Sequence, residues 1–293
     1  MLTPASLNRR GWTNARLGAA LALVGASVAV AFDAWRDIFR IATRDDEASH
    51  VFLVPFVVAW LFWTRRGRLR HIRPAESFAG PLGVLLGWAL YSVGDTLLLQ
   101  SLYHAGAIVM AVGCLVTVLG PAMLKQFLPA FLTLVLLIPL PGRLREQIAI
   151  PLQTWTARLT AELFSLLGAP VTRSGNMLSV NGSDIEIAEA CNGLRMTFVL
   201  GLAVIAFAFG SPMRTYARVL LLVATPFAAV ACNVVRLVPT VWLYGYHPAS
   251  FATTFHDVGG WVTLGVAYLL LLGIIRLLRW ALLPVTTYTL AYD

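Results

Sequence analysis

The stretch V-F-L-V-P-F-V-V-A-W-L-F-W at Val51 to Trp63, followed by T-R-R-G-R-L-R-H-I-R at Thr64 to Arg73, decides how the chain is laid across a membrane. The uncharged apolar run is predicted to be a membrane helix, and five arginines follow it in one short loop. Because cytoplasmic loops of membrane proteins carry an excess of Lys and Arg, this loop is predicted to be cytoplasmic. The directions of all other expected spans follow from it.

The composition supports a membrane protein. Apolar residues make up 58% of the 293 residues and charged residues only 12%, whereas a soluble domain needs a polar surface. We therefore expect an all-α polytopic membrane protein with about eight transmembrane helices. The 22 Lys and Arg exceed the 14 Asp and Glu, but the arginines lie between apolar runs. They are interpreted as topology signals and contacts to anionic lipids, and we expect no nucleic-acid partner.

Basic residues at the ends of the other apolar runs set the order of the spans. Arg9, Arg10 and Arg16 precede the first run, which predicts a cytoplasmic N-terminus and a retained first span. The segment Asp33 to His50 would then be an outer loop, where outer means the side away from the cytoplasm. The bias is moderate, so the inverted orientation stays open. The expected spans are Leu17–Phe32, Val51–Trp63, 79–99, 105–120, Gln126–Leu140, Gly193–Phe209, Val219–Cys232 and Val258–Ile275.

A polar and apolar segment at Arg143 to Leu167 separates the fifth and sixth spans. Its apolar residues recur every three or four positions with charged residues between them, which predicts an amphipathic helix in the outer interface, ended by Gly168 and Pro170. Asn181-Gly182 is typical of a two-residue hairpin turn, so a small β-hairpin element is expected next. The β-prone pieces are Val171–Arg173, Met177–Val180 and Ile185–Ala188.

Three polar stretches stand where apolar runs begin or end at one predicted membrane face. They are I-A-E-A-C-N-G-L-R at Ile187 to Arg195, N-V-V-R at Asn233 to Arg236 and F-H-D at Phe255 to Asp257. Cys191, Arg236 and His256 would meet at that face. A thiol, a fixed cation and an imidazole together are the groups needed for acyl transfer by a cysteine nucleophile.

The surroundings of Cys191 favour a reactive thiol over a packed one. Asn192 and Gly193 follow it at a predicted helix start, where backbone N–H groups favour a thiolate and can hold an oxyanion. Glu189 opposes a thiolate and can instead orient Arg195 or Arg236. The remaining two cysteines, Cys114 and Cys232, lie within apolar runs and are interpreted as packing residues.

Each of the other two groups has a structural alternative. Arg236 is either an interfacial anchor or an oxyanion-binding cation, and Asn233, three residues earlier on the same helical face, can orient its guanidinium. His256 is either a helix N-terminal histidine bonded by Asp257 or a proton carrier, and His50 is a weaker candidate. A metal site formed by Cys191, His256 and Asp257 lacks the usual ligand spacings, so no metal or cofactor is expected.

Four ordered blocks resemble the signature blocks of the exosortase and archaeosortase family. They are S-H-V-F-L-V-P at Ser49, E-A-C-N-G-L-R, N-V-V-R and F-H-D-V-G-G-W, and together they span about Ser49 to Trp261. The resemblance implies one integral-membrane domain over residues 1–293, with Cys191 as nucleophile, Arg236 as catalytic arginine and His256 as catalytic histidine. Asn192 stands where Ser is common and Val51 where Gly is common, which bears on the subfamily and its partner motif.

By this resemblance, the protein is expected to be a cysteine protease or transpeptidase of the bacterial inner membrane with a periplasmic active site. Its substrates would be secreted proteins whose C-terminal sorting signal contains a short motif such as Pro-Glu-Pro, a transmembrane helix and a basic tail. The alternative is a non-enzymatic transporter or polysaccharide-export component in which Asp95, Arg195 and Arg236 line a path. No internal repeat is evident, and the sharpest polar groups lie at one face rather than at the midplane.

Overall fold

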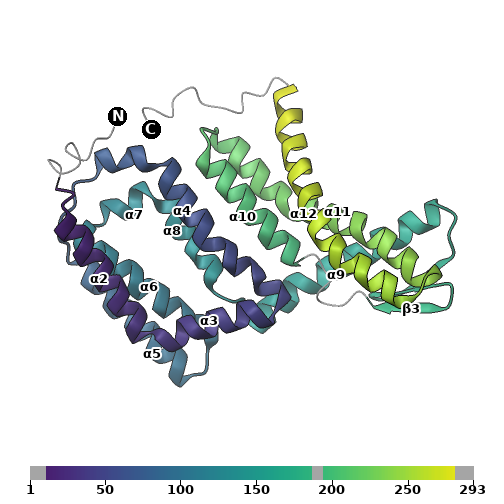
Figure 1. Cartoon of the computed structure of the whole chain (residues 1–293), viewed down its shortest axis with the longest axis horizontal. Helices are drawn as coiled ribbons and strands as arrows, with labels where there is room; N and C mark the ends of the chain where they lie inside the picture. Colours follow the sequence, from purple (N-terminus) through teal and green to yellow (C-terminus); the bar gives the residue numbers. More distant parts are fainter. Residues whose placement is uncertain (1–10, 187–193, 281–293) are drawn as a thin grey trace. The chain divides into compact units, whose positions relative to one another are not determined.

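The computed structural model describes residues 11–186 and 194–280, which fall into two compact units (Figure 1). The first unit comprises Met1–Pro141, Ile205–Pro212 and Tyr288–Asp293, and the second comprises Gly142–Val204 and Met213–Thr287. Each unit is described by itself below. The expected single domain over residues 1–293 stays a prediction.

The first unit is built from helices in its described part. In chain order they are α2 (Asn14–Val30), α3 (Phe32–Arg44), η1 (Asp46–Leu53), α4 (Val54–Thr64), η2 (Arg66–His71), α5 (Ala79–Thr96), α6 (Gln100–Leu119), α7 (Ala122–Gln126), α8 (Leu128–Thr133) and η3 (Leu134–Leu137). The hydroxyl of Thr13 caps the start of α2 by accepting a hydrogen bond from the Arg16 N–H, and α6 ends at Gly120, whose φ of 80° suits glycine.

Two kinds of contact hold the first unit together. Helices α5 and α6 lie side by side (Figure 1), and glycines such as Gly94 and Gly106 let their backbones approach closely, as is common between membrane helices. A second cluster surrounds Leu61 and Phe127, where the rings of Phe62 and Phe127 stack at 4.6 Å. The basic loop packs onto this cluster, because the Arg65 Nε donates to the Phe209 carbonyl at 2.8 Å.

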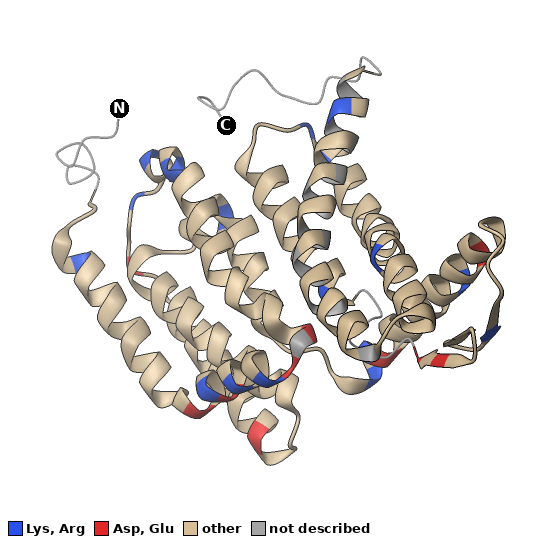
Figure 2. Ribbon diagram, turned by 45° about the vertical axis from the view of Figure 1, so that its right-hand side comes forward, with Lys and Arg blue, Asp and Glu red and all other residues tan. Residues whose placement is uncertain are grey.

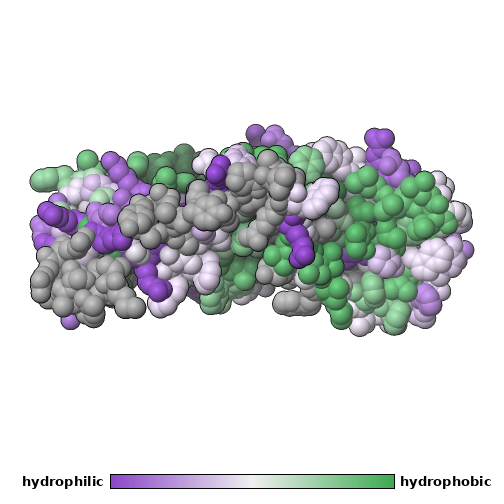
Figure 3. Space-filling view, turned by 90° about the horizontal axis from the view of Figure 1, so that it is seen from above, coloured by the Kyte–Doolittle hydropathy of each residue, from purple (hydrophilic) through white to green (hydrophobic). Residues whose placement is uncertain are grey.

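Helix lengths and composition confirm a helical membrane protein. In the described part, the segments Glu47–Thr64, Gln100–Leu119 and Thr215–Tyr246 are long and apolar enough to cross a membrane, and two bent helix pairs raise the number of candidate spans to five. At most half of each of the three segments is buried within the protein, so many of their apolar side chains are exposed. Figure 3 shows such hydrophobic surface in green. The count of eight spans stays a prediction.

The segment Asp33 to His50 was expected to be a loop, and that expectation is wrong. It contains the 13-residue helix α3 and the 3-10 helix η1, and α3 bends by 76° from α2. Ala34, Ile38 and Ala42 recur every four residues and form its buried stripe. The charged residues between them hid an amphipathic helix that has no long apolar run.

Two smaller boundaries also differ. The turn before α6 is Leu97 to Leu99 rather than Gln100 to His104, because α6 already begins at Gln100. The expected fifth span, Gln126 to Leu140, is divided into the 6-residue α8 and the 4-residue η3. Pro129 lies in the first turn of α8, where proline is tolerated, and Pro139 follows η3, where it disfavours continuation of the helix.

The second unit contains four helices and a sheet in its described part. They are α9 (Gly142–Leu166), β1 (Val171–Ser174), β2 (Met177–Val180), β3 (Ser183–Glu186), α10 (Leu194–Gly210), whose residues after Val204 belong to the first unit, α11 (Thr215–Tyr246) and α12 (Ala249–Trp280). The predicted amphipathic helix is confirmed within one residue at each end.

The two faces of α9 are the reverse of those in a soluble protein. Most of its large apolar residues are exposed, including Trp155 at 52% and Leu159 at 42%, whereas Leu152 and Phe164 are buried. Its buried face carries smaller and polar residues, among them Ala157, Thr156 and Gln153. An exposed apolar stripe suits contact with lipid, whereas small residues allow close packing between helices in a membrane.

The sheet is a three-stranded antiparallel meander. Val180 pairs with Ser183 across a two-residue turn in which Asn181 and Gly182 have φ values of 50° and 77°. Two successive positive φ angles are those of a type I′ hairpin turn, so the predicted turn is confirmed. Leu178 and Val180 of β2 pack with Leu237 and Val241 of α11, so the sheet covers the last turns of that helix.

Helices α11 and α12 are each 32 residues long and form an antiparallel hairpin around His247 and Pro248. Helix α11 continues to Tyr246, beyond the expected end of the seventh span at Cys232, and that membrane boundary stays a prediction. Helix α12 begins at Ala249, so His256 is not at the N-terminus of its helix. Each helix is about 48 Å long at 1.5 Å per residue, longer than a hydrocarbon core of about 30 Å.

Candidate functional site

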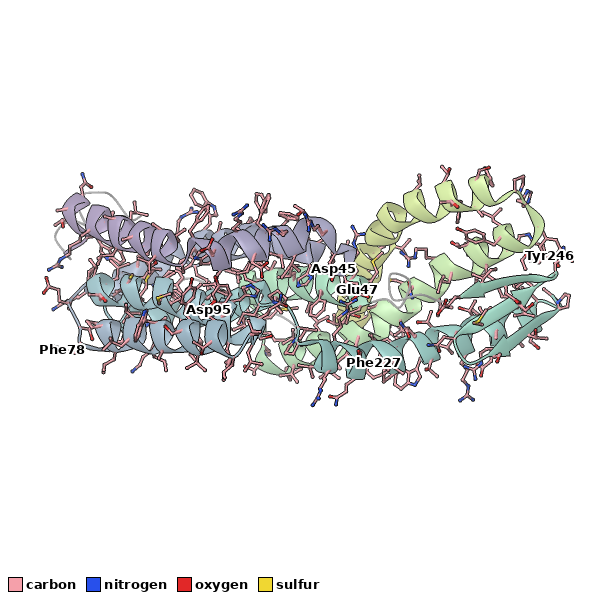
Figure 4. The ribbon with its side chains drawn as sticks, turned by 90° about the horizontal axis from the view of Figure 1, so that it is seen from below. Asp45, Glu47, Phe78, Asp95, Phe227 and Tyr246 are labelled. Atoms are coloured by element: carbon pink, nitrogen blue, oxygen red, sulfur yellow. The ribbon has the colours of Figure 1, made fainter. Side chains whose placement is uncertain are left out.

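Arg236 is the best-described residue of the candidate site. It lies in α11 between Phe227 and Tyr246, which Figure 4 labels, and its side chain is partly buried. The Arg236 Nη2 donates a 3.0 Å hydrogen bond to the Oδ1 of Asn233, which is fully buried. The predicted orientation of the guanidinium by Asn233 is confirmed. The Thr240 hydroxyl in turn bonds the Arg236 carbonyl at 2.8 Å.

The stem of Arg236 crosses the hairpin to α12. A Cβ added at Gly259, which is buried, would lie 3.6 Å from the Arg236 Cγ. Arg236 precedes His247 by 11 residues and Gly259 follows Pro248 by 11 residues, so the two positions face each other across an antiparallel hairpin. The close approach of α12 at Gly259 leaves room for the arginine stem.

His256 lies one helical turn before Gly259 in α12. Positions three residues apart share a helical face, so the backbone places position 256 on the α12 face that carries Gly259. The side chains of His256 and Asp257 lie outside the described part of the structure. The structure therefore brings Arg236 beside the turn of α12 that runs from position 256 to Gly259. The contact between Arg236 and the imidazole stays a prediction.

The segment 187–193, which contains Cys191, lies outside the described residues, and only the residues that flank it are placed. Glu189, Cys191, Asn192 and Gly193 fall within 187–193. After this segment, Leu194 opens α10 and packs with Leu152 of α9 and with Val230 and Val234 of α11. Arg195, the next residue, is partly buried.

His50 belongs to the first unit and is buried. Its Nδ1 donates to the Glu47 carbonyl at 2.9 Å, which stabilises the turn of η1. Glu47, labelled with Asp45 in Figure 4, is also buried, at 5% exposure. A buried carboxylate at the start of a candidate span is a functional candidate that the sequence analysis missed, because Glu47 lay in a segment interpreted as a loop.

Two buried hydroxyls on α9 were also missed. Thr156 and Thr160 are fully buried, and within the described part of the chain neither Oγ1 has a hydrogen-bond partner. Thr133, Thr225 and Thr240, which are buried helix threonines as well, each bond the carbonyl four residues earlier. The i, i+4 spacing of Thr156 and Thr160 was the available signal, but the analysis used only the apolar periodicity of this helix.

A family model described as "Transmembrane exosortase" matches residues 35–273, which is more than half of the chain. The chain belongs to the transmembrane exosortase family. Comparison with curated proteins and with solved structures gave no match. The matched range contains all ten candidate residues of this exosortase, from His50 to Asp257.

The expected absence of a metal site at Cys191, His256 and Asp257 stays a prediction. Among the described residues, no group of three or more His, Cys, Asp and Glu side chains could hold a metal ion. Because Cys191 and the side chain of His256 lie outside that set, the metal-free site stays a prediction for this exosortase.

The bond between Asn233 and Arg236 predicts an energetic coupling in the exosortase. Asn233→Leu keeps the approximate volume but removes the acceptor, and we expect a loss of about 1.5–3 kcal/mol of stability, the range for hydrogen bonds to charged groups. Thermal unfolding of the purified protein in detergent measures this loss as a lower melting temperature.

A double-mutant cycle supplies the control. Arg236→Met combined with Asn233→Leu removes both partners, so the double variant should be more stable than the sum of the two single losses predicts. Strictly additive losses would show that the two side chains do not stabilise each other.

Proposed function

We propose that this exosortase is a membrane-embedded cysteine protease or transpeptidase that cleaves the C-terminal sorting signal of secreted proteins. The observation that carries the proposal is Arg236, bonded to Asn233 and packed on α12 one turn from His256, in a chain of the exosortase family. A guanidinium held in this way suits a developing oxyanion.

Depth along the helices supports a common membrane level for Arg236 and His256. At 1.5 Å per residue, Arg236 lies about 32 Å along α11 from Thr215, and His256 lies about 30 Å along α12 from Arg276. Arg218 and Arg276 mark the ends of these helices that we assign to the cytoplasm. Both candidate residues then lie about one hydrocarbon thickness away, at the outer interface.

Chain connectivity supports the same location for the nucleophile. Cys191 is three positions before Leu194, so their Cα atoms are at most about 11 Å apart. Leu194 packs with Val234, which lies two residues before Arg236. This limit is compatible with the proposed location of the thiol near the guanidinium, where Asn192 and Gly193 would contribute backbone N–H groups.

The proposed mechanism is acyl transfer through a thioester. His256, assisted by Asp257, accepts the thiol proton of Cys191, and the sulfur attacks the carbonyl carbon of the scissile peptide bond. Arg236 and the backbone N–H groups stabilise the oxyanion. The C–N bond then breaks, and His256 gives the proton to the departing amine. Water or another nucleophile releases the acyl group from sulfur, and its proton returns through His256.

The membrane makes weak recognition sufficient. A substrate anchored by its own helix is confined to the plane of the bilayer, which raises the effective concentration of its scissile bond. We propose substrates that carry a short motif such as Pro-Glu-Pro, a transmembrane helix and a basic tail, in the bacterial inner membrane. Glu189, Arg195 and His50 are proposed supporting residues, and we propose an eight-span topology with the site on the periplasmic side.

Orientation can be tested with reporter fusions. The arginine loop predicts a cytoplasmic signal from a fusion at Gly67, and the outer position of the sheet predicts a periplasmic signal from a fusion at Gly175. Both positions are open to the surroundings, since nothing lies within 4 Å of a Cβ built at either glycine. A periplasmic signal at Gly67 would overturn the orientation.

Replacement of the nucleophile tests the reaction. Cys191→Ala should leave a co-expressed protein with a C-terminal helix and basic tail uncleaved, and Cys191→Ser should lose nearly all turnover because a hydroxyl is a poorer nucleophile. Immunoblotting measures the cleaved fraction. The matched control is Cys114→Ser, which replaces a buried thiol of the first unit.

The cleavage experiment also tests the two alternatives to a cysteine enzyme, a non-enzymatic membrane protein and a metal site. Normal cleavage by Cys191→Ala would exclude the cysteine mechanism and favour a non-enzymatic transporter or export component. Loss of cleavage in a chelator, with rescue by zinc, would support a metal site instead.

The role of Arg236 predicts that charge alone is insufficient. Arg236→Lys should lower the cleavage rate by about 100- to 1000-fold, the typical cost of removing one oxyanion donor, because lysine lacks the planar fork of donors that Asn233 orients. The measurement is the initial rate of substrate cleavage at matched enzyme levels.

Arg158→Lys is the matched control, since Arg158 is exposed and paired with Glu162 at 2.8 Å. A lysine at a lipid-anchoring position would reach the headgroups equally well. Near-normal cleavage by Arg236→Lys would therefore remove Arg236 from the mechanism and leave Arg195 as the candidate cation.

A further inference from the structure

Helix α3 of the first unit carries a stripe of three arginines that the proposed reaction does not use. Arg36, Arg40 and Arg44 are four residues apart and all exposed, and we call them the arginine stripe. Figure 2 shows them as blue bands along α3. Within the described residues, no hydrogen bond or ion pair joins their guanidinium groups to another group.

The position of α3 places the arginine stripe at a membrane surface. Helix α2 is about 26 Å long at 1.5 Å per residue, close to the thickness of the hydrocarbon core. At its end the chain bends by 76° into α3. Five charged residues within 13 would be costly in hydrocarbon, so α3 lies along the interface at which α2 leaves the membrane.

The other faces of α3 are occupied by protein or suited to lipid. Ala34, Ile38 and Ala42 form the buried face, opposite the arginine stripe. The side chain of Asp37 contacts His104 of α6, with 3.0 Å between the carboxylate Oδ2 and the ring Nε2. The exposed ring of Phe39 meets Phe52 edge-on at 5.6 Å.

These contacts hold the helix in one rotation about its axis. The arginine stripe is therefore fixed on the side away from the protein, next to exposed aromatic residues such as Phe32 and Phe39. Arginine beside an aromatic row is typical of a helix that lies in the headgroup region.

We propose that the arginine stripe of α3 binds the phosphate headgroups of anionic phospholipids in the leaflet where α2 ends. Phosphate suits the guanidinium fork, and one helical turn of about 5.4 Å separates successive arginines, which is close enough for neighbouring headgroups. Asp33 lies in the first turn of the helix, where a carboxylate is favoured by the helix dipole. Asp37 contacts His104, and within the described residues no ion pair joins either carboxylate to the stripe.

The test measures the lipid composition beside α3. A fluorophore is attached to Thr43→Cys, an exposed position next to Arg44. The Cys191→Ala background removes one of the three native cysteines, and the other two, Cys114 and Cys232, are buried, so the label is directed to position 43. The protein is reconstituted in phosphatidylcholine vesicles with a minor share of phosphatidylglycerol. Quenching by nitroxide-labelled phosphatidylglycerol is compared with quenching by nitroxide-labelled phosphatidylcholine at equal label concentration.

We expect phosphatidylglycerol to be enriched at the fluorophore by about 5-fold or more, since one basic residue near a membrane surface contributes about this factor. The Arg36→Gln, Arg40→Gln and Arg44→Gln triple variant should lower the quenching ratio to one. The corresponding Lys triple variant should retain most of the enrichment, and high salt should weaken it.

The matched control is a Gln triple variant of Arg66, Arg68 and Arg70, which lie in the basic loop. It should leave the quenching ratio at position 43 unchanged if the effect is local to α3. Equal quenching ratios in the parent protein and the α3 Gln variant would overturn the proposal. Equal ratios, combined with slower substrate cleavage when the same three Gln substitutions are made in the chain that retains Cys191, would identify an acidic polypeptide as the partner instead.

Discussion

The second unit depends on a charged side chain that must be satisfied where two helices meet. Arg236 stands in the interior of α11, and a guanidinium at a bilayer is costly unless it finds polar partners or reaches the interface. Asn233 supplies an oxygen, and the absence of a side chain at Gly259 makes room for the stem. The Asn233 bond lies within α11, whereas the approach of Gly259 to the arginine stem requires one register of α11 against α12. The opposite face of α11 then receives α9 and the sheet through Leu237 and Val241.

Local signals in the sequence predicted the elements of this unit well. The ends of α9 follow from Gly142 and Gly168, and the hairpin follows from Asn181-Gly182, because each depends on a few neighbouring residues and their backbone preferences. The pairing of Asn233 with Arg236 was also predictable, since it needs only helical spacing. The family followed from four ordered blocks, and the matched range confirms it.

The ends of α11 and α12 could not be found in the same way. A polar residue after an apolar run marks the membrane boundary, but a helix can continue into the interface when other elements pack on it. Here β2 covers Leu237 and Val241, and Tyr244 and Thr253 place their hydroxyls 3.2 Å apart across the hairpin. Such tertiary contacts carry no local signal. The geometry of Cys191 and of the His256 ring lies outside the described residues, so the triad itself stays a prediction.

A property of the bilayer explains why the sequence analysis missed Thr156 and Thr160. Inside a bilayer, lipid is as apolar as a leucine side chain, so large apolar residues gain little by turning inward and helices pack through small or polar residues. Apolar periodicity therefore locates the lipid face of a membrane helix, whereas in a soluble protein it locates the core. On α9 the residues between the apolar positions face the protein, and they include Gln153 and both threonines. Candidate site residues of an exosortase should accordingly be sought on the small and polar stripe of each helix.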